Sequence, residues 1–441
     1  MLARIKNKFS RVLRTLSSPK EVNDSSTGFN VRNIDVQEIK QFLAAHPLKL
    51  FKGAKSNTPL VVDTDNKARF IRFSLQTTVS FHLDTIEIYN KNGVNVAKNK
   101  RTIISSMYND DPKYNGEGAL KGRKNGGNGF HTKREANPWL IVDLGSIRNL
   151  DKVIVYNTEG QFYTRALSLK IETSRDLVNW SEIYDNWSAI KGCGQSSVAE
   201  QGLLFAGILE ASKAQAVIKE LKKTDRYDDA LYYHDLVNQL VKDKGVALGP
   251  HGFTQTFDLR SDSKKQKVYS ELSWLLKVLN EDFGVAAFIS SGTLLGIVRD
   301  GAFIGHDDDV DICYISNAYS EQGVLEERES LVAFLVELGC RVSPSGIAHY
   351  WCTTPNGLNL DIFTGFIEQG YCSMNPIGRR KLTTDKVLPL DKSHYQGVEL
   401  YLPNDPNSLL LLNYGESWRT PDPLWTFNWG QAKSDFKFLY F

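Results

Sequence analysis

The pattern of hydrophobic and polar residues divides the chain into a strand-rich first half and a second half that mixes helices and strands. In the first half, short hydrophobic runs alternate with turns rich in Asn, Gly and Asp, which is typical of antiparallel strands. The expected strands are residues 68–75, 81–89, 139–144, 152–156 and 166–173. Several short strands with few helical signals predict an antiparallel β-sandwich over residues 58–190.

Helical periodicity marks the segments on either side of this sandwich. Hydrophobic residues recur at intervals of three and four positions, which predicts amphipathic helices. The segments with this pattern are residues 1–18, 35–45, 208–221, 227–241, 265–283 and 321–338. We therefore expect a helical linker over residues 191–260. Residues 261–441 also contain hydrophobic strands, including a hairpin around Pro355-Asn356-Gly357, and are expected to form a mixed α/β domain.

Residues 1–18 combine a hydrophobic stripe with lysine and arginine on the remaining surface and contain no acidic residue. Such a helix can lie on an anionic membrane surface, with docking on the protein itself as the alternative. No hydrophobic run approaches the roughly 18 to 20 residues that span a bilayer, and the N-terminus lacks the hydrophobic core of a signal peptide. We therefore expect a cytoplasmic protein, peripheral on the inner face of the cytoplasmic membrane.

Length, net charge and cysteine count indicate how many domains to expect, which partners to exclude and which redox environment to expect. A chain of 441 residues that is 41% hydrophobic has enough material for two or three folded domains. The net charge of +2 gives no bulk attraction to nucleic acid, so no nucleic-acid partner is expected. Five cysteines without paired spacing are typical of reduced thiols in a cytosolic protein.

The strongest chemical signal is a run of four aspartates, Asp307, Asp308, Asp309 and Asp311. Hydrophobic residues interleave with the last two, which predicts a half-buried strand with both carboxylates on one face. Two carboxylates about 4 Å apart repel by roughly 4 kcal/mol at an effective dielectric constant near 20. A divalent cation removes that repulsion, and hard oxygen ligands favour Mg²⁺ or Mn²⁺. We therefore predict a catalytic metal site.

A candidate phosphate site lies just upstream. Ser291, Gly292 and Thr293 follow a predicted strand and precede a short apolar helix, residues 294–298. A small, glycine-containing turn at a helix N-terminus presents backbone N–H groups to an anion. Arg299 follows closely and can clamp a phosphate through two hydrogen bonds. A phosphate cradle followed by a metal-binding strand is what metal-assisted phosphoryl transfer needs.

Four further residues are candidates for the same chemistry. Asp361 lies between hydrophobic neighbours in a predicted strand, which is unfavourable for a carboxylate without a partner. We predict a metal-binding or general-base role for it. His349, on the facing strand, is a candidate acceptor-side base or hydrogen-bond donor. Arg379 and Arg380 are candidates for holding a diphosphate, with a solvated surface as the equal alternative.

The motifs around these residues resemble the LicD family, which includes the fukutin-like proteins. The resemblance rests on Gly292-Thr293-Leu294-Leu295-Gly296, Arg299, Phe303-Ile304, residues 307–312 and, nearer the C-terminus, residues 396–405 and 414–418. It implies a fold like that of polymerase-beta-type nucleotidyltransferases and transfer of a phosphorylated alcohol from a CDP-linked donor to a glycan. The family also has an aspartate on a later strand, where this chain has Asp361. Gly305-His306 stand where many relatives have Pro-Trp.

The strand-rich region resembles a discoidin-type (coagulation-factor C-type) domain, a galactose-binding-like jelly roll. The matching segments are residues 137–145, 153–157 and 174–180. Ligands of such sandwiches usually meet the loops at one end. Asn128, His131 and Arg134 are therefore candidate glycan-binding residues, with ordinary solvated loop residues as the alternative.

Together these observations predict an α+β multidomain protein with an N-terminal antiparallel β-sandwich and a C-terminal nucleotidyltransferase-like mixed α/β domain. The expected function is metal-dependent transfer of a phosphorylated alcohol, of the phosphocholine, ribitol phosphate or glycerol phosphate type. The donor is a CDP-alcohol, and the acceptor is a hydroxyl of a cell-surface glycan in bacterial capsule or lipopolysaccharide synthesis. Two alternatives stay open, a nucleotidyltransferase that moves NMP and a non-catalytic glycan-binding protein.

Overall fold

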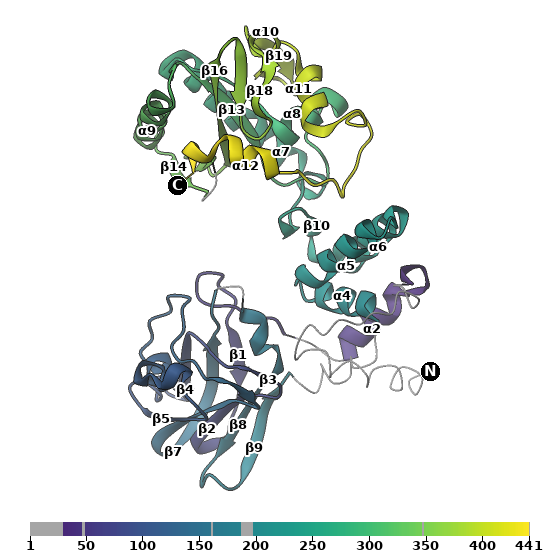
Figure 1. Ribbon diagram of the computed structural model, residues 1–441. Coiled ribbons are helices and arrows are strands. Elements are labelled where there is room, and N and C mark those ends of the chain that lie inside the picture. The colour runs from purple at the N-terminus through teal and green to yellow at the C-terminus, as the bar shows by residue number, and fades with distance from the viewer. Residues whose placement is uncertain (1–29, 46–48, 160–161, 187–196, 346–347, 441) are drawn as a thin grey trace. The chain divides into compact units, whose positions relative to one another are not determined.

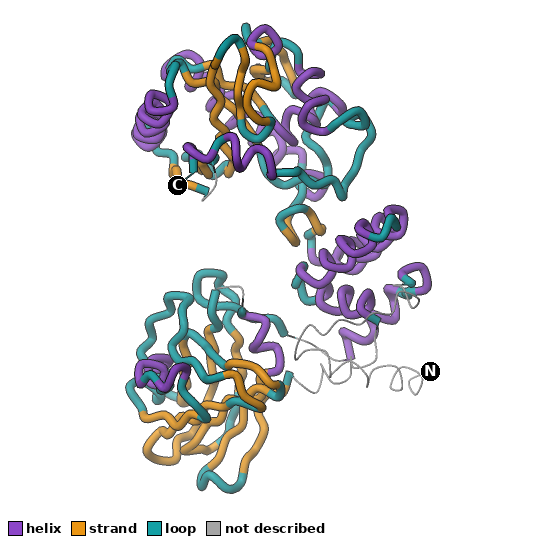
Figure 2. The backbone as a smooth tube through the Cα atoms, in the orientation of Figure 1, coloured by secondary structure: helices purple, strands orange, loops and turns teal. Residues whose placement is uncertain are grey.

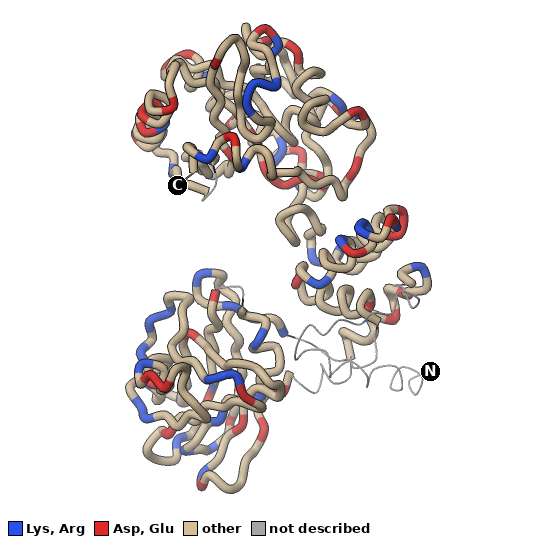
Figure 3. Tube along the Cα trace, in the orientation of Figure 1, with Lys and Arg blue, Asp and Glu red and all other residues tan. Residues whose placement is uncertain are grey.

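The computed structural model describes residues 30–45, 49–159, 162–186, 197–345 and 348–440 (Figure 1). The chain divides into two compact units, Met1–Leu240 and Val241–Phe441. The amphipathic helix predicted over residues 1–18 lies outside the described residues. Among the residues described, no helix combines the length and the hydrophobicity needed to cross a membrane. Acidic and basic residues are interspersed over both units (Figure 3).

The first unit contains the predicted antiparallel sandwich, which confirms this half of the fold-class prediction. Its main strands are β1 (Leu60–Asp63), β2 (Lys67–Leu75), β4 (Thr85–Asn90), β5 (Arg101–Ile104), β7 (Trp139–Tyr156), β8 (Leu169–Ser174) and β9 (Trp180–Asp185). The strand order is β1-β7-β2-β8-β9, and β4 and β5 also pair with β7. Two short strands, β3 (Thr78–Ser80) and β6 (Arg134–Ala136), form a separate antiparallel pair. Short 3₁₀ turns occupy part of the long loop between β5 and β6.

Strand β7 joins the two layers of the sandwich. Its first half pairs with β2 and β5, and its second half pairs with β1 and β4. The sequence pattern predicted two separate strands here, because residues 145–149 between the halves are exposed and interrupt the hydrophobic alternation. Pairing with β2 resumes within this stretch, because the register passes across an irregularity from Phe70–Asp143 to Ala68–Arg148 and ends at Lys67–Asn149. A single strand can therefore change pairing partners at a stretch where the alternation of buried and exposed residues is interrupted.

His82 is a buried histidine in the sandwich, with its ring centroid 5.3 Å from that of His131. Burial lowers the pKa of His82 to about 4, and the nearby charges of His131 and Arg165 add to the shift. The unfolded chain takes up this proton near pH 6.5, whereas the folded state does so only near pH 4. The contribution of His82 to stability is therefore present above pH 6.5 and is lost as the pH falls toward 4.

We expect His82→Gln to reduce the acid sensitivity of the sandwich. The free energy of unfolding should fall between pH 7 and pH 4. This fall should be about 3 kcal/mol larger in the wild type than in the variant. Urea unfolding at a series of pH values, followed by tryptophan fluorescence, measures this difference. Parallel curves for the wild type and the variant would show that His82 does not titrate across folding.

Helices complete the first unit. They are α2 (Val36–Ala45), α4 (Val198–Gly207), α5 (Ser212–Lys223) and α6 (Tyr227–Val241). Helix α4 was not predicted, because most of its residues are buried and it lacks a polar face. It begins at a capping box in which Ser197 and Glu200 satisfy each other's backbone N–H groups. The predicted helical linker also ends early, since β10 (Ala247–Gly249) and β11 (Gly252–Thr254) form a hairpin.

The second unit is built on a mixed sheet with helices packed against it (Figures 1 and 2). Its strands are β12 (Ala286–Ile289), β13 (Asp311–Ser316), β14 (Arg341–Pro344), β15 (Tyr350–Thr353), β16 (Asn359–Glu368), β17 (Tyr371–Met374) and β18 (Gly378–Thr383). The order is β12-β13-β16-β15-β14, and β17 joins β18 to β16. Strands β13 and β16 run parallel, and the other pairs of described strands in this sheet are antiparallel. This confirms the second half of the fold-class prediction.

The helices of this unit are α7 (Asp262–Lys277), α8 (Ser291–Asp300), α9 (Glu321–Glu337), α10 (Thr384–Val387), α11 (Pro406–Tyr414) and α12 (Gly430–Asp435). A π-helical turn, Val278–Phe283, extends α7. Helix α7 packs on the strand β20 (Val398–Leu402), which pairs with β19 (Asp391–Tyr395). Helix α8 packs on β13, and α11 packs on α8. Four cysteines are buried and free, namely Cys313, Cys340, Cys352 and Cys372.

Candidate active site

Parallel pairing of β13 with β16 brings the two predicted aspartates together. The register aligns Asp311 with Asp361, and Asp309 lies two residues before β13. Val310 and Ile312 are fully buried, so the alternation predicted from the sequence holds although the strand begins later than expected. Oxygen atoms of Asp309, Asp311 and Asp361 lie within 4.8 Å of one another. The structure therefore assembles all three predicted metal ligands at one point.

The N-terminus of α8 holds Asp311 in place. The Gly292 N–H donates to Asp311 Oδ2 at 3.1 Å, and the Asp311 N–H donates to Thr293 Oγ1 at 2.8 Å. We predicted these residues as a phosphate cradle, but their polar groups bind the aspartate instead. The positive end of a helix dipole favours a carboxylate as readily as a phosphate. Of the predicted cradle, Ser291 and Gly292 line the cavity above the carboxylates, and the Ser291 hydroxyl has no hydrogen-bond partner among the described residues.

Mutual repulsion and burial dominate the electrostatics of this cluster. Burial raises the pKa of Asp309 to about 8, and Asp307 adds to the shift. Burial and the neighbouring Asp309 and Asp361 carboxylates hold the pKa of Asp311 well above its usual range. The donor set is all oxygen, which fits a hard divalent cation such as Mg²⁺ or Mn²⁺. The cluster therefore has the composition and the excess negative charge of a metal site.

His251, at the tip of the β10–β11 hairpin, adds a second group of possible metal ligands. Its Nδ1 lies 3.1 Å from Asp308 Oδ1, and its Nε2 lies 3.8 Å from Asp309 Oδ2. The hydrogen bond to Asp308 and the nearby aspartates raise the pKa of His251 to about 9 against the opposing effect of burial. One atom from each of His251, Asp308 and Asp309 fits within 4.8 Å. Asp309 therefore belongs to both groups.

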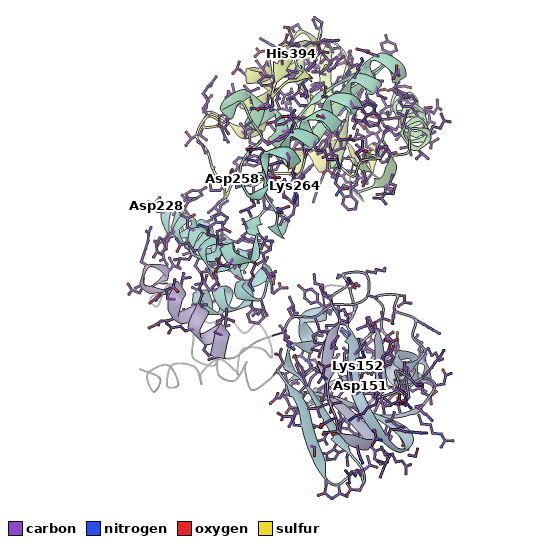
Figure 4. All side chains as sticks on the ribbon, turned by 180° about the vertical axis from the view of Figure 1, so that it is seen from behind. Asp151, Lys152, Asp228, Asp258, Lys264 and His394 are labelled. Atoms are coloured by element: carbon purple, nitrogen blue, oxygen red, sulfur yellow. The ribbon has the colours of Figure 1, made fainter. Side chains whose placement is uncertain are left out.

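The loop that carries these aspartates is fastened to the 3₁₀ turn Phe257–Leu259. The Phe257 N–H donates to Asp307 O, and the Asp258 N–H donates to Gly305 O, both at 2.8 Å. A Cβ atom at residue 305 would lie 2.4 Å from Cγ of Asp258, which is labelled in Figure 4. Glycine at this position, where many LicD relatives have proline, therefore leaves room for Asp258. The sequence pattern had not indicated this contact.

His349 pairs with the third carboxylate. Its Nε2 lies 3.2 Å from Asp361 Oδ2, and the side chain is buried. Its Nδ1 is also buried and has no hydrogen-bond partner in the part of the chain that the structure describes. The histidine directly precedes β15, the strand that pairs with β16. The structure places His349 where it can orient Asp361, and its predicted role as acceptor-side base or hydrogen-bond donor stays a prediction.

A cavity of about 600 Å³ opens above the carboxylates. Arg299 lines it, and its guanidinium donates to both carboxylate oxygens of Asp300 at 2.8–3.1 Å. Polar residues 413, 417, 420 and 422 also face this space. The aromatic lining residues are Trp351, Phe363, Tyr414, Trp418, Trp425, Phe427 and Trp429. The cavity therefore has a charged floor and a largely aromatic wall, a combination suited to a ligand with phosphate and ring components.

Arg379 and Arg380 do not belong to this site, contrary to the prediction. Neither is among the described residues that line the cavity. Arg379 binds Glu368 at 2.8 Å and Glu321 at 2.7 Å. Glu368 ends β16 seven residues after Asp361, which places it about 20 Å along the strand. The two arginines therefore stabilise the far end of the sheet.

The candidate glycan-binding residues of the sandwich do not converge on one cavity. Asn128 lines a cavity of about 260 Å³ among charged and polar loop residues. His131 packs instead on Tyr108, with ring centroids 4.7 Å apart. Arg134 lies exposed on β6. Asn128 is thus the one member of the three that faces a described cavity.

Comparison with known proteins identifies both domains. Residues 284–405 match the family model described as LicD/FKTN/FKRP, nucleotidyltransferase domain. Residues 102–201 match the F5/8 type C domain. Both predicted resemblances are confirmed: the chain carries a LicD domain and a discoidin-type domain. The LicD match includes Asp309, Asp311, His349 and Asp361 and ends before the aromatic residues 414–429. A LicD domain indicates a transferase, of a kind that moves phosphate-containing groups onto glycans.

Solved structures with similar regions are nucleotidyltransferases. One is the lincosamide antibiotic adenylyltransferase LnuA with bound lincomycin, at 14% identity and a TM-score of 0.24 over 38% of this chain and 94% of that one. Another is the STING-associated CdnE c-di-GMP synthase from Capnocytophaga granulosa, at 13% identity and a TM-score of 0.21 over 40% of this chain and 54% of that one. A comparison with curated proteins gives no match.

Proposed function

We propose that the protein transfers a phosphorylated alcohol from a CDP-alcohol donor to a hydroxyl group of a glycan, and that the reaction requires Mg²⁺ or Mn²⁺. The observation that carries this proposal is the cluster of Asp309, Asp311 and Asp361 on the floor of the cavity. One buried and two half-buried carboxylates this close are unfavourable without a cation. The alcohol is of the phosphocholine, ribitol phosphate or glycerol phosphate type.

Different residues around the cluster would bind different parts of the donor complex. Asp309, Asp311 and Asp361 would hold the cation, and the α8 N-terminus fixes Asp311 through Gly292. A bound divalent cation neutralises charge on the diphosphate as the bond to CMP breaks. Arg299 lies on the cavity wall and forms an ion pair with Asp300. It would bind non-bridging phosphate oxygens.

The His349–Asp361 pair would act on the hydroxyl group of the acceptor. The acceptor oxygen forms the new bond to phosphorus, the bond between phosphorus and the CMP oxygen breaks, and the acceptor hydroxyl must lose its proton. Asp361 is the carboxylate best placed to accept that proton, because His349 holds its other oxygen at 3.2 Å. The buried histidine keeps the carboxylate in one orientation.

Release of CMP tests the proposal. Purified protein is incubated with Mg²⁺ or Mn²⁺ and a panel of CDP-alcohols, with and without glycan acceptors, and the products are read by mass spectrometry. We expect metal-dependent CMP release with one donor and none in the presence of EDTA. Pyrophosphate release from nucleoside triphosphates, without CMP release, would replace the proposal with transfer of NMP. Silence in both assays would favour a non-catalytic glycan-binding protein.

We further propose that the sandwich binds the acceptor polymer and that residues 1–18 contact an anionic membrane surface, in bacterial capsule or lipopolysaccharide synthesis. Tethering a polymer near the cavity would raise its local concentration without new contacts at the active site. Removal of the sandwich, residues 58–190, should then weaken transfer to long polymers and leave transfer to short acceptors unchanged. Equal rates on both acceptors in the shortened protein would exclude the tethering role.

A further inference from the structure

Three aromatic residues of the cavity wall come from one short segment after α11. Residues 425–429 read Trp-Thr-Phe-Asn-Trp and are neither helix nor strand. Trp425, Phe427 and Trp429 are partly buried and line the cavity, whereas Asn428 is exposed. The segment therefore presents three neighbouring rings to the cavity. The centroid of Phe427 lies 5.9 Å from that of Trp425 and 4.8 Å from that of Trp429.

A tryptophan on the sheet faces the same end of the cavity. Trp351 is directly opposite Asp361 in the β15–β16 register, and opposed residues of an antiparallel pair share one face of the sheet. Trp351 lines the cavity, yet 53% of its surface is exposed. A large hydrophobic side chain left open to a cavity is suited to a ligand.

His349 and Asp361 lie between these aromatic groups. The ring of His349 is 6.4 Å from that of Trp351 and 6.5 Å from that of Trp429. Arg299 lines the cavity from a different element, helix α8, which packs on α11. The end with Trp351 and Trp429 therefore surrounds the carboxylate that would take a proton from the acceptor, and the donor phosphates belong nearer to Arg299.

The arrangement of the rings favours a sugar over a nucleobase. A flat base is bound best between parallel rings, but the planes of Phe427 and its two neighbours meet at 51° and 74°. Trp429 is nearer to parallel with His349 and Phe363, at 28° and 23°, but His349 is already engaged with Asp361. A sugar ring has an apolar face of C–H groups that packs on a single aromatic ring and a polar rim of hydroxyls. The exposed Asn428 and Thr426 beside the rings offer hydrogen bonds to such a rim.

We propose that Trp351, Phe427 and Trp429 form the subsite for the acceptor sugar and hold the attacking hydroxyl beside Asp361. This subsite rests on the proposed function and adds its acceptor-binding residues. Phe427 and Trp429 lie beyond the segment that matches the LicD model. The aromatic segment would thus select the acceptor independently of the carboxylates on the cavity floor.

Steady-state kinetics of Trp351→Ala and Phe427→Ala test the subsite. With a working donor, we expect kcat/KM for the acceptor to fall at least about 10-fold in each variant. The donor KM and the slow hydrolysis of donor without acceptor should stay within about two-fold of the wild type. Trp351→Phe should recover part of the loss. Tyr319→Ala is the matched control, because this tyrosine of the same unit is 94% exposed and is absent from the cavity lining.

Equal losses in the donor and acceptor parameters would overturn the acceptor subsite, and so would unchanged kinetics. Binding without turnover separates this failure from failure of the proposed function. Quenching of tryptophan fluorescence is measured with CMP and with malto-, chito- and galacto-oligosaccharides. Saccharide quenching that Phe427→Ala removes would support the subsite even if no CDP-alcohol is cleaved. Quenching by CMP alone would assign the wall to the nucleobase, and absence of any quenching would also reject the subsite.

Discussion

Replacement of Asp309 or Asp311 by asparagine should lower kcat/KM for transfer by at least about 1,000-fold. Each substitution removes one negative charge from a group whose oxygen atoms lie within 4.8 Å of those of Asp361. Cation binding should weaken in parallel, because an amide oxygen replaces a carboxylate oxygen. Initial rates over a range of Mn²⁺ concentrations, together with calorimetric titration of Mn²⁺, measure both effects.

Stability separates this loss from misfolding. In the metal-free wild type, burial and mutual repulsion destabilise these carboxylates, and together they raise the pKa of Asp309 to about 8. The Tm of the metal-free asparagine variants should therefore equal or exceed that of the wild type, and Mn²⁺ should raise it less. Asp282→Asn, at an exposed acid of the same unit, is the matched control. Full activity in either active-site variant would rule out the metal mechanism.

Arg299→Lys should lower kcat/KM for the donor by about 100-fold. The lysine keeps the charge but loses the planar fork that binds two oxygens at once. Arg299 already presents its guanidinium in a fixed orientation, with two hydrogen bonds to Asp300 and a side chain that is 8% exposed.

Donor-dependent initial rates measure this effect, and Arg341→Lys, at an exposed arginine of β14, is the control. The acceptor KM should change much less than the donor KM. A variant with unchanged donor kinetics would show that Arg299 supports Asp300 and does not bind phosphate. Recovery of activity by Arg299→Gln would lead to the same conclusion, because glutamine carries no charge.

Local patterns were enough to predict the three carboxylates that the structure brings together. Val310 and Ile312 are buried on either side of Asp311, and this alternation is visible in the sequence. Asp361 stood out because a carboxylate between hydrophobic residues needs a partner. These signals depend only on residues adjacent in the sequence, so they can be recognised without knowledge of the fold.

Contacts between distant segments were harder to predict. The sequence placed Arg379 and Arg380 near a phosphate, but the β16–β17–β18 meander carries them to Glu368 and Glu321. His251 reaches Asp308 from 57 positions upstream. Partner choice over such separations depends on topology, which periodicity does not encode.

The sequence by itself determined which residues carry charge, which strands are buried and which two families the domains resemble. Tertiary structure decided how those residues are used. Parallel pairing of β13 with β16 sets Asp311 beside Asp361, and the α8 N-terminus binds Asp311 through Gly292. Trp425, Phe427 and Trp429, near the C-terminus, line the cavity that contains the carboxylates. The physical reason is that burial and electrostatic coupling depend on distance in space, which the spacing of residues along the chain does not specify.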